Sequence, residues 1–243
     1  MLKSILIFLT LSVSTVVHAS VVIMGTRVVY PATKKSINVQ LNNDNKSPAL
    51  VQSWLDMGDA TAEPGSIHVP FIITPPIFRM NPESGQSIRI VYTGEPLPQD
   101  RESIFYLNVL DVPVKPKMKK GDGDLDVVDN YLQLAVRSRI KFFFRPDNLK
   151  IAPVDAYQRV TWHQEDGGRS IKVVNPTPYY ITYNKISVGN NEQLIPVEQG
   201  GMISPFSSRV FLLKDKPAIA SKVMWVIVND YGGYQQGEST LER

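Results

Sequence analysis

The sequence predicts an all-β protein built from two β-sandwich domains. Helical periodicity is nearly absent, and short runs of alternating or β-branched residues recur instead. Each run is bounded by Pro, Gly, Asn or Asp, as in sandwiches with frequent turns. No segment between the turns has the pattern of a crossover helix, so a parallel sheet is not expected.

The first nineteen residues predict an export signal. Lys3 supplies a positive start, Ile5–Val17 is an apolar run, and Val17-His18-Ala19 ends in the small-x-small pattern of a cleavage site. The apolar run is short for a membrane span, and no stop-transfer segment follows it. We therefore expect residues 1–19 to be removed, which leaves an exported protein that begins at Ser20 and has no membrane insertion.

The composition excludes several classes of protein. The formal charge is +3, of which Lys3 contributes one, so the chain lacks the strongly basic charge that is typical of nucleic-acid-binding proteins. It contains no cysteine, although export leads to an oxidising compartment. The mature chain must therefore be stabilised by burial of its apolar core.

Eleven strands are predicted along the 243 residues. Ser36–Asn42 shows the pattern most clearly, because Ile37, Val39 and Leu41 alternate with polar residues. The predicted strands are Val21–Tyr30, Ser36–Asn42, Leu50–Met57, Ser87–Tyr92, Ser103–Val109, Tyr131–Phe144, Arg159–His163, Ser170–Val174, Tyr179–Val188, Arg209–Lys214 and Lys222–Asn229.

The longest predicted strand ends at a domain boundary. Arg145-Pro146-Asp147 follows it, Pro153 comes shortly after, and proline interrupts strand pairing. We place the boundary near residues 146–152, with an N-terminal domain over 20–147 and a C-terminal domain over 148–243. Each half has about the size of one immunoglobulin-like sandwich.

Residues 113–130 depart from the strand pattern. The segment PVKPKMKKGDGDLDVVDN is rich in Pro, Lys, Gly and Asp, which is typical of a solvated loop. Its acidic run Asp122–Asp126 resembles the start of a calcium loop, but Val127 and Gln133 stand where such a loop needs Gly and Glu. A metal site is therefore not expected.

Nothing in the sequence indicates catalysis or a cofactor. The mature chain has only two histidines, His68 and His163, and they fall in different predicted domains. A cysteine nucleophile, a nucleophile elbow, a zinc-binding helix motif and a phosphate-binding loop are all missing from the sequence. We therefore predict a binding protein and not an enzyme.

Two cations lie within strongly apolar strand sequences. Arg27 follows Val21–Thr26, and Lys141 precedes Phe142-Phe143-Phe144. A buried cation is costly without an anionic partner, so each could simply face solvent or protect a strand edge. Alternatively, both could line a cleft that receives an anion such as a chain-terminal carboxylate. The residues alone favour the solvent-facing interpretation.

The strand Tyr131–Phe144 presents an alternating apolar face. Ile140, Phe142 and Phe144 are expected in the core, whereas Leu132, Leu134 and Val136 follow the long loop directly. The beginning of such a strand could add to the sheet of another protein.

Seven segments together resemble the PapD-like periplasmic pilus-assembly chaperones. Their order and spacing, spread over the whole mature chain, make the resemblance specific. The segments are Gly25–Pro31, Leu41–Asn43, Thr74–Arg79, Pro98–Asn108, Arg139–Pro146, Asn175–Tyr180 and Asn229–Gly233.

This resemblance implies a fold and a site. Two immunoglobulin-like domains are expected to join at an angle with a subunit-binding cleft between them. In that cleft Arg27 and Lys141 are expected to grip the C-terminal carboxylate of a pilus subunit, which overturns the solvent-facing interpretation. The remaining expected site residues are the donor-strand residues Val128, Leu132, Leu134 and Val136, and the interdomain charges Glu102, Arg145 and Asp230. A cis proline is expected within Thr74-Pro75-Pro76.

The implied function is a periplasmic chaperone that completes unfinished pilus subunits by donor-strand complementation. It would then deliver them to an outer-membrane usher. The alternative weighed was a secreted structural fimbrial subunit or adhesin. The family divides into members with a short loop and members with a long loop before the donor strand. The long 113–131 segment suggests the long-loop class, whereas the missing cysteines suggest the short-loop class, so the class stays open. The sequence also does not decide whether the free protein self-associates.

Overall fold

A computed structural model describes residues 21–113, 134–190, 192–217 and 220–242. The predicted signal peptide (1–19), the segment 114–130 and the predicted donor residues Val128 and Leu132 lie outside these ranges. In the part of the chain that is described, no helix is long and apolar enough to cross a membrane.

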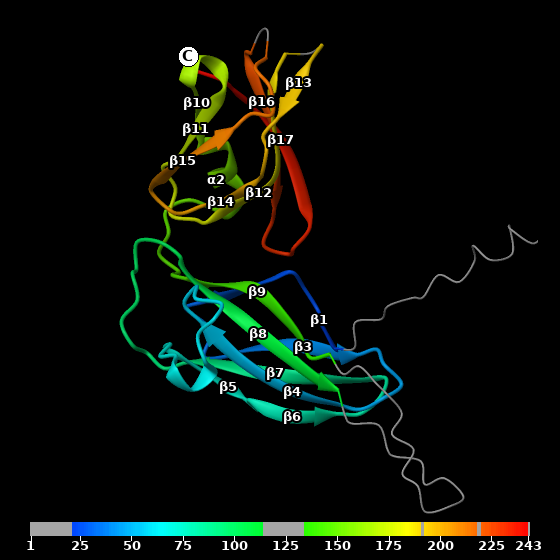
Figure 1. Ribbon diagram of the computed structural model, residues 1–243. Coiled ribbons are helices and arrows are strands. Elements are labelled where there is room, and N and C mark those ends of the chain that lie inside the picture. The colour runs from blue at the N-terminus through cyan, green and yellow to red at the C-terminus, as the bar shows by residue number, and fades with distance from the viewer. Residues whose placement is uncertain (1–20, 114–133, 191, 218–219, 243) are drawn as a thin grey trace, which may run out of the picture.

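The N-terminal domain is a sandwich of two sheets (Figure 1). One sheet has the strand order β1-β3-β7-β5, and the other has the order β2-β9-β8-β4-β6. A 3-10 helix, Pro64–Ser66, precedes β5. The strands are β1 Val21–Ile23, β2 Arg27–Pro31, β3 Ile37–Asn43, β4 Ala49–Asp56, β5 Phe71–Thr74, β6 Ile77–Met80, β7 Ser84–Tyr92, β8 Ser103–Pro113 and β9 Val136–Arg145.

The C-terminal domain is a second sandwich. Its sheets have the orders β10-β11-β15 and β13-β12-β16-β17, and β14 also pairs with β12. The short helix α2 (Pro153–Ala156) and two 3-10 helices, Tyr157–Arg159 and Asp166–Gly168, complete it. The strands are β10 Thr161–Glu165, β11 Ser170–Asn175, β12 Ile181–Gly189, β13 Leu194–Pro196, β14 Gly201–Ile203, β15 Ser207–Leu212, β16 Lys222–Val228 and β17 Tyr234–Thr240.

The predicted strand Val21–Tyr30 is wrong as a single element. The chain bends at Met24–Thr26, where Gly25 has a φ of 136° that side chains rarely adopt. β1 therefore pairs with β3 in one sheet, whereas β2 pairs with β9 in the other. The β2–β9 pair is parallel, so the second sheet is mixed, which the sequence did not predict.

The predicted strand Tyr131–Phe144 begins later in the described part of the chain. β9 starts at Val136, and Leu134 and Ala135 precede it outside any strand. Five strands were missed altogether: β5, β6, β13, β14 and β17. β17 was not predicted because its sequence is polar. It contains Gly237, where a side chain would not fit, because a Cβ there would lie 2.3 Å from the Trp225 ring.

Each domain has a separate hydrophobic core. The N-terminal core gathers Tyr30, Phe71, Phe105, Phe142 and Phe144 among aliphatic residues from both sheets. The C-terminal core packs around Trp162, Tyr183 and Trp225, whose rings meet edge to face. Because the two cores are separate, contacts at the domain junction can form without altering the packing of either core.

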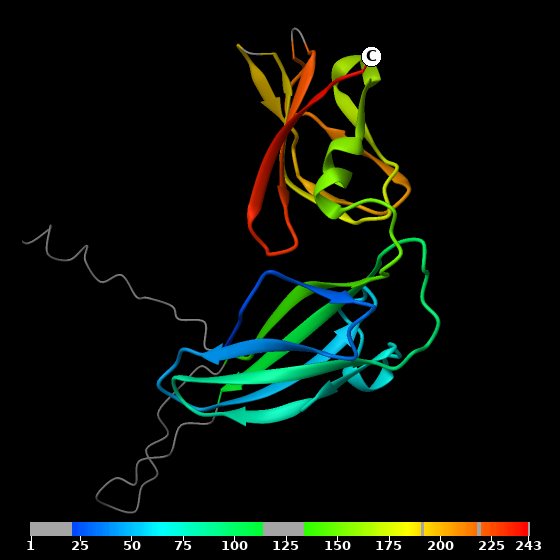
Figure 2. The same ribbon diagram turned by 180° about the vertical axis from the view of Figure 1, so that it is seen from behind.

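The domains meet end to end (Figures 1 and 2). The linker after β9 lies at one side of the junction, and the tip of the β16–β17 hairpin reaches the N-terminal domain at the other. There the Thr26 hydroxyl lies 3.5 Å from the Gly232 carbonyl oxygen. A Cβ on Gly232 would lie 2.4 Å from that hydroxyl, so this close approach requires glycine.

Candidate functional site

Four cations lie at odd-numbered positions of β9: Arg137, Arg139, Lys141 and Arg145. Alternate residues of a strand share a face, so these side chains follow one another along the same side of the sheet. They differ in what surrounds them. Arg137, Arg139 and Arg145 form ion pairs with carboxylates, whereas Lys141 has no carboxylate partner among the described residues.

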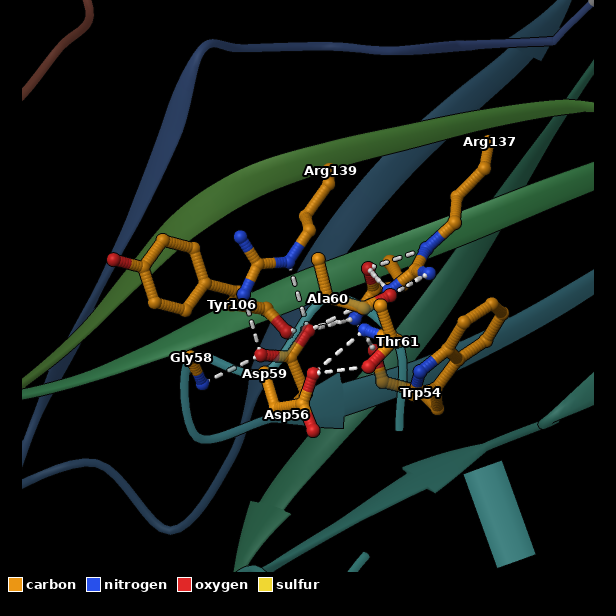
Figure 3. A network of polar contacts seen from close by, with 10 residues as sticks. Trp54, Asp56, Gly58, Asp59, Ala60, Thr61, Tyr106, Arg137 and Arg139 are labelled. Atoms are coloured by element: carbon orange, nitrogen blue, oxygen red, sulfur yellow. Dashed lines mark hydrogen bonds and ion pairs between the residues drawn. The ribbon is translucent and has the colours of Figure 1, made fainter. Parts of the chain in front are cut away.

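Asp56, at the end of β4, neutralises the first two cations (Figure 3). Its side chain is 1% exposed and accepts two hydrogen bonds from Arg139, at 2.6 and 2.9 Å. Arg137 Nη2 lies 3.7 Å from the same carboxylate, and Asn108 donates to it at 2.7 Å. Burial alone would raise the pKa of Asp56, but these donors lower it below its usual value.

Aromatic rings hold the two guanidinium groups in place. Arg139 lies 3.7 Å from the centre of the Tyr106 ring, and Arg137 lies 4.9 Å from that of Trp54. Arg137 also donates to the Asn108 side-chain oxygen at 2.7 and 2.9 Å. This cluster is satisfied internally and fixes β9 to β8 and β4.

Arg145 connects the two domains. It donates to Glu102 at 2.7 Å and to both oxygens of Asp230 at 2.7 and 2.8 Å. Burial opposes its charge, yet the two carboxylates outweigh burial and raise the pKa of Arg145. The second Glu102 oxygen accepts the backbone N–H of Tyr180 at 2.9 Å. The structure thus brings together all three predicted interdomain charges.

Arg27 and Lys141 have no anionic partner among the described residues. They are opposite each other in the parallel β2–β9 pair. Lys141 Nζ donates to the Thr182 hydroxyl of β12 at 3.0 Å, across the domain junction. The Arg27 Nε is buried and makes no hydrogen bond, and the guanidinium lies 5.6 Å from the centre of the Phe143 ring. Within the described ranges, neither cation forms an ion pair.

Burial lowers the pKa of both cations. Desolvation, helped by the charge of Arg27, lowers the pKa of Lys141 to about 8. Desolvation also lowers the pKa of Arg27, despite the raising influence of Tyr157 and Asp230. Two half-buried, uncompensated cations side by side can bind an anion strongly, because an incoming carboxylate removes the penalty on both.

The beginning of β9 offers an open strand edge. β8 pairs with β9 from Val136 to Phe144, but β2 covers the other edge only from Lys141 onward. In the described part of the chain no strand pairs with that edge at Val136–Ile140. Leu134 is 63% exposed and Val136 is 48% exposed, so an apolar row continues beside this edge.

The position and direction of β2 place the two cations at one end of the open edge. β2 runs parallel to β9 and begins opposite Lys141. Another strand that added to the open edge in the same direction would run toward the first residue of β2. Its carboxyl terminus would then arrive at Arg27 and Lys141.

Sequence reasoning missed several parts of this site. Asp56, the partner of Arg139, was missed because it lies 83 residues away and no sequence spacing signals the pair. Thr182 was also missed, because its position beside Lys141 depends on how the domains pack. The structure places the cis peptide bond between Thr74 and Pro75. Among the described residues, no cluster of His, Asp and Glu could hold a metal ion.

Comparison with known proteins identifies relatives along nearly the whole chain. Residues 20–150 match the model for "Pili and flagellar-assembly chaperone, PapD N-terminal domain", and residues 155–239 match "Pili assembly chaperone PapD, C-terminal domain". The chaperone protein HifB of Haemophilus influenzae is 43% identical over 226 residues, which covers 93% of this chain and 89% of HifB. The probable fimbrial chaperone YadV of Escherichia coli is 43% identical over 228 residues, covering 92% and 90%.

Solved structures agree with these relatives. The crystal structure of the YadV chaperone superposes with a TM-score of 0.76 at 39% identity, covering 92% of this chain and 100% of that one. A Salmonella enterica structure of SafA pilin in complex with the SafB chaperone matches with a TM-score of 0.73 at 27% identity, covering 93% and 98%. Both domains of the fold are therefore shared with these proteins.

Proposed function

The chain belongs to the PapD-like family of pilus-assembly chaperones, and we propose that it captures pilus subunits through Arg27, Lys141 and the open edge of β9. It is a periplasmic chaperone of the fimbrial chaperone–usher type, and it acts by binding and not by catalysis. Family membership sets aside the alternative of a structural subunit or adhesin.

A single observation carries the proposal: two neighbouring half-buried cations lack an anionic partner at the end of an open strand edge. The terminal carboxylate of a subunit strand would supply that anion. Charge-assisted hydrogen bonds of this kind contribute about 1.5–3 kcal/mol each. Backbone pairing along Val136–Ile140 would then place the client strand in register.

The apolar row supplies the donated side chains. In this proposal Leu134 and Val136, together with Val128 and Leu132 outside the described residues, fill the groove that an incomplete subunit exposes. Burying each aliphatic side chain contributes roughly 1.5–3 kcal/mol. The same contact covers the unpaired strand edge of the subunit, which would otherwise promote aggregation.

The Glu102–Arg145–Asp230 network has a supporting role in the proposal. It fixes the angle between the domains and so keeps Thr182 beside Lys141. We further propose that the loaded chaperone hands its client to an outer-membrane usher, where the extension of the next subunit replaces the donor strand. The SafA–SafB complex supports the capture step, since it pairs a pilin with a relative of this chain.

Calorimetric titration with a synthetic peptide tests the carboxylate site. The peptide corresponds to the C-terminal strand of a candidate pilus subunit and is made with either a free carboxylate or a carboxamide end. We expect the carboxylate form to bind at least about tenfold more tightly, since one charge-assisted hydrogen bond exceeds 1.4 kcal/mol. Equal affinity of the two forms would refute the assignment.

A pull-down of the co-expressed subunit tests the donor strand. Leu134→Asp places a charge on the proposed donating face and should reduce capture strongly. Ala135→Asp is the matched control, because Ala135 is exposed and belongs to the opposite face. Equal losses in the two variants would contradict the proposed register.

A further inference from the structure

A groove lies at the domain junction, beside the linker and away from the carboxylate site. It has a volume of about 470 Å³, within the range of small-molecule sites. Five parts of the chain line it: the loop before β8, the linker after β9, the 3-10 helix Tyr157–Arg159, the loop between β11 and β12, and the turn before β15. Figures 1 and 2 show the linker and the β16–β17 hairpin at opposite sides of the junction. We call this cavity the hinge groove.

Phe206 gives the hinge groove an exposed aromatic wall. The residue has a φ of 50°, a left-handed conformation that is costly for a bulky side chain. Its N–H donates to the Thr177 carbonyl at 3.2 Å, and the ring is nevertheless 48% exposed. Pro178 and Ile151 line the same groove, so the strained turn holds an aromatic ring at an apolar cavity.

The charges around the hinge groove are unbalanced. Asp100 lines it, but Arg101 neutralises that carboxylate with hydrogen bonds at 2.7 and 3.0 Å. The Arg101 guanidinium also lies 5.0 Å from the centre of the Phe206 ring. Lys150 and Arg159 line the groove as well, and neither pairs with an acidic side chain of the described chain. The excess charge at the cavity is therefore positive.

We propose that the hinge groove binds a small organic anion with an apolar body. The apolar body would lie against Phe206, Pro178 and Ile151. Its carboxylate or sulfonate would face Lys150 and Arg159, where charge-assisted hydrogen bonds form. The site is separate from the client site, because none of its lining residues belongs to β9 or β2.

Titration with naphthoate, followed by amide chemical shifts in NMR, tests the site. Neutral naphthamide is the matched probe without charge. We expect naphthoate to shift the amides of Leu149, Ile151 and Ser207, and to bind more tightly than naphthamide. Shifts confined to residues 134–140, or equal affinity of the two probes, would overturn the proposal.

Variants separate the apolar and charged parts of the site. Arg159→Gln should weaken naphthoate about tenfold and leave naphthamide unchanged, as loss of one charge-assisted hydrogen bond predicts. Phe206→Ala should weaken both probes. Leu212→Ala is the control, since Leu212 is 55% exposed in β15 but does not line the groove. An unchanged melting temperature shows that each variant is folded, and equal effects of Phe206→Ala and Leu212→Ala would refute the site.

Discussion

Arg139 and Lys141 lie two residues apart on the same face of β9, yet their surroundings are opposite. Arg139 makes two hydrogen bonds to the buried Asp56 carboxylate, whereas Lys141 reaches only the hydroxyl of Thr182. Arg139 is neutralised within the fold, whereas Lys141 has no carboxylate partner among the described residues. The difference shows that the acceptors around a strand, and not its own sequence, decide which of its charges is available for binding.

The Asp56 cluster and the Arg27–Lys141 pair also differ in how much the burial of their charges destabilises the free protein. A buried ion pair with additional hydrogen bonds recovers the desolvation energy of its charges, and the Asp56 cluster has such bonds from Asn108 and Gly58. Lys141 and Arg27 recover only part of this energy without an anion, because desolvation still lowers the pKa of both groups. A client would therefore stabilise the chaperone as well as itself.

The largest expected effect on binding is a loss of client affinity. Lys141→Met or Arg27→Gln removes one of the two cations, and each should weaken binding of the carboxylate peptide about 10–100-fold. Arg137→Gln, which alters a cation held by the Asp56 cluster, should change affinity less than about threefold. Calorimetry measures all three. A loss with Arg137→Gln as large as that with Lys141→Met would remove the distinction between the two regions.

The largest expected effect on stability is at Asp56. Asp56→Ala leaves Arg139 and Asn108 without their acceptor and should lower the free energy of unfolding by about 3–5 kcal/mol. Asp59→Ala is the control in the same loop, because Asp59 is exposed and its hydrogen bonds to the N–H and hydroxyl of Thr61 are local; it should cost under about 0.5 kcal/mol. Urea denaturation of both variants checks this, and similar small losses would contradict the structural role of Asp56.

Lys141→Met should act on stability in the opposite direction from Arg139→Met. Removing an uncompensated half-buried ammonium should raise the free energy of unfolding by about 1–2 kcal/mol, after discounting for its partial exposure to solvent. Arg139→Met should lower it, because Asp56 then loses its main donor. If urea denaturation at neutral pH shows both variants destabilised equally, Lys141 is not an uncompensated charge.

The smallest effect is a dependence on pH. The folded protein releases the Lys141 proton near pH 8, whereas the unfolded chain retains it to about 10.5. The unfolded state therefore binds more protons in this window, so stability rises with pH there. The gap between the wild type and Lys141→Met should close as pH increases from about 8 to about 10.5. A gap that stays constant would contradict the lowered pKa.

Much of the architecture follows from sequence patterns. Alternation predicted strands such as β3 and β16 closely, and the apolar run Phe142–Phe144 predicted the core end of β9. The bend at Gly25 was not predicted, because the surrounding Val and Ile residues have the same strand pattern on both sides of it. Polar edge strands such as β17 likewise lack the signal that burial would give.

The candidate site was predictable only in part. Arg27 and Lys141 are conspicuous as cations in apolar strands, but the residues alone favoured a solvent-facing interpretation, and only family resemblance indicated an anion. Asp56 and Thr182 could not be found, because contacts across sheets and domains depend on packing that no local pattern encodes. The hinge groove depends on five separate segments that only the folded chain brings together.

The ionisation of Lys141 tests the central claim most directly. NMR titration of selectively labelled lysine reports its pKa in the free protein and in the presence of the carboxylate peptide. We expect a pKa of about 8 for Lys141 in the free protein, rising by at least about one unit when the client carboxylate binds. An unchanged or lower pKa in the complex would mean that Lys141 does not receive the carboxylate.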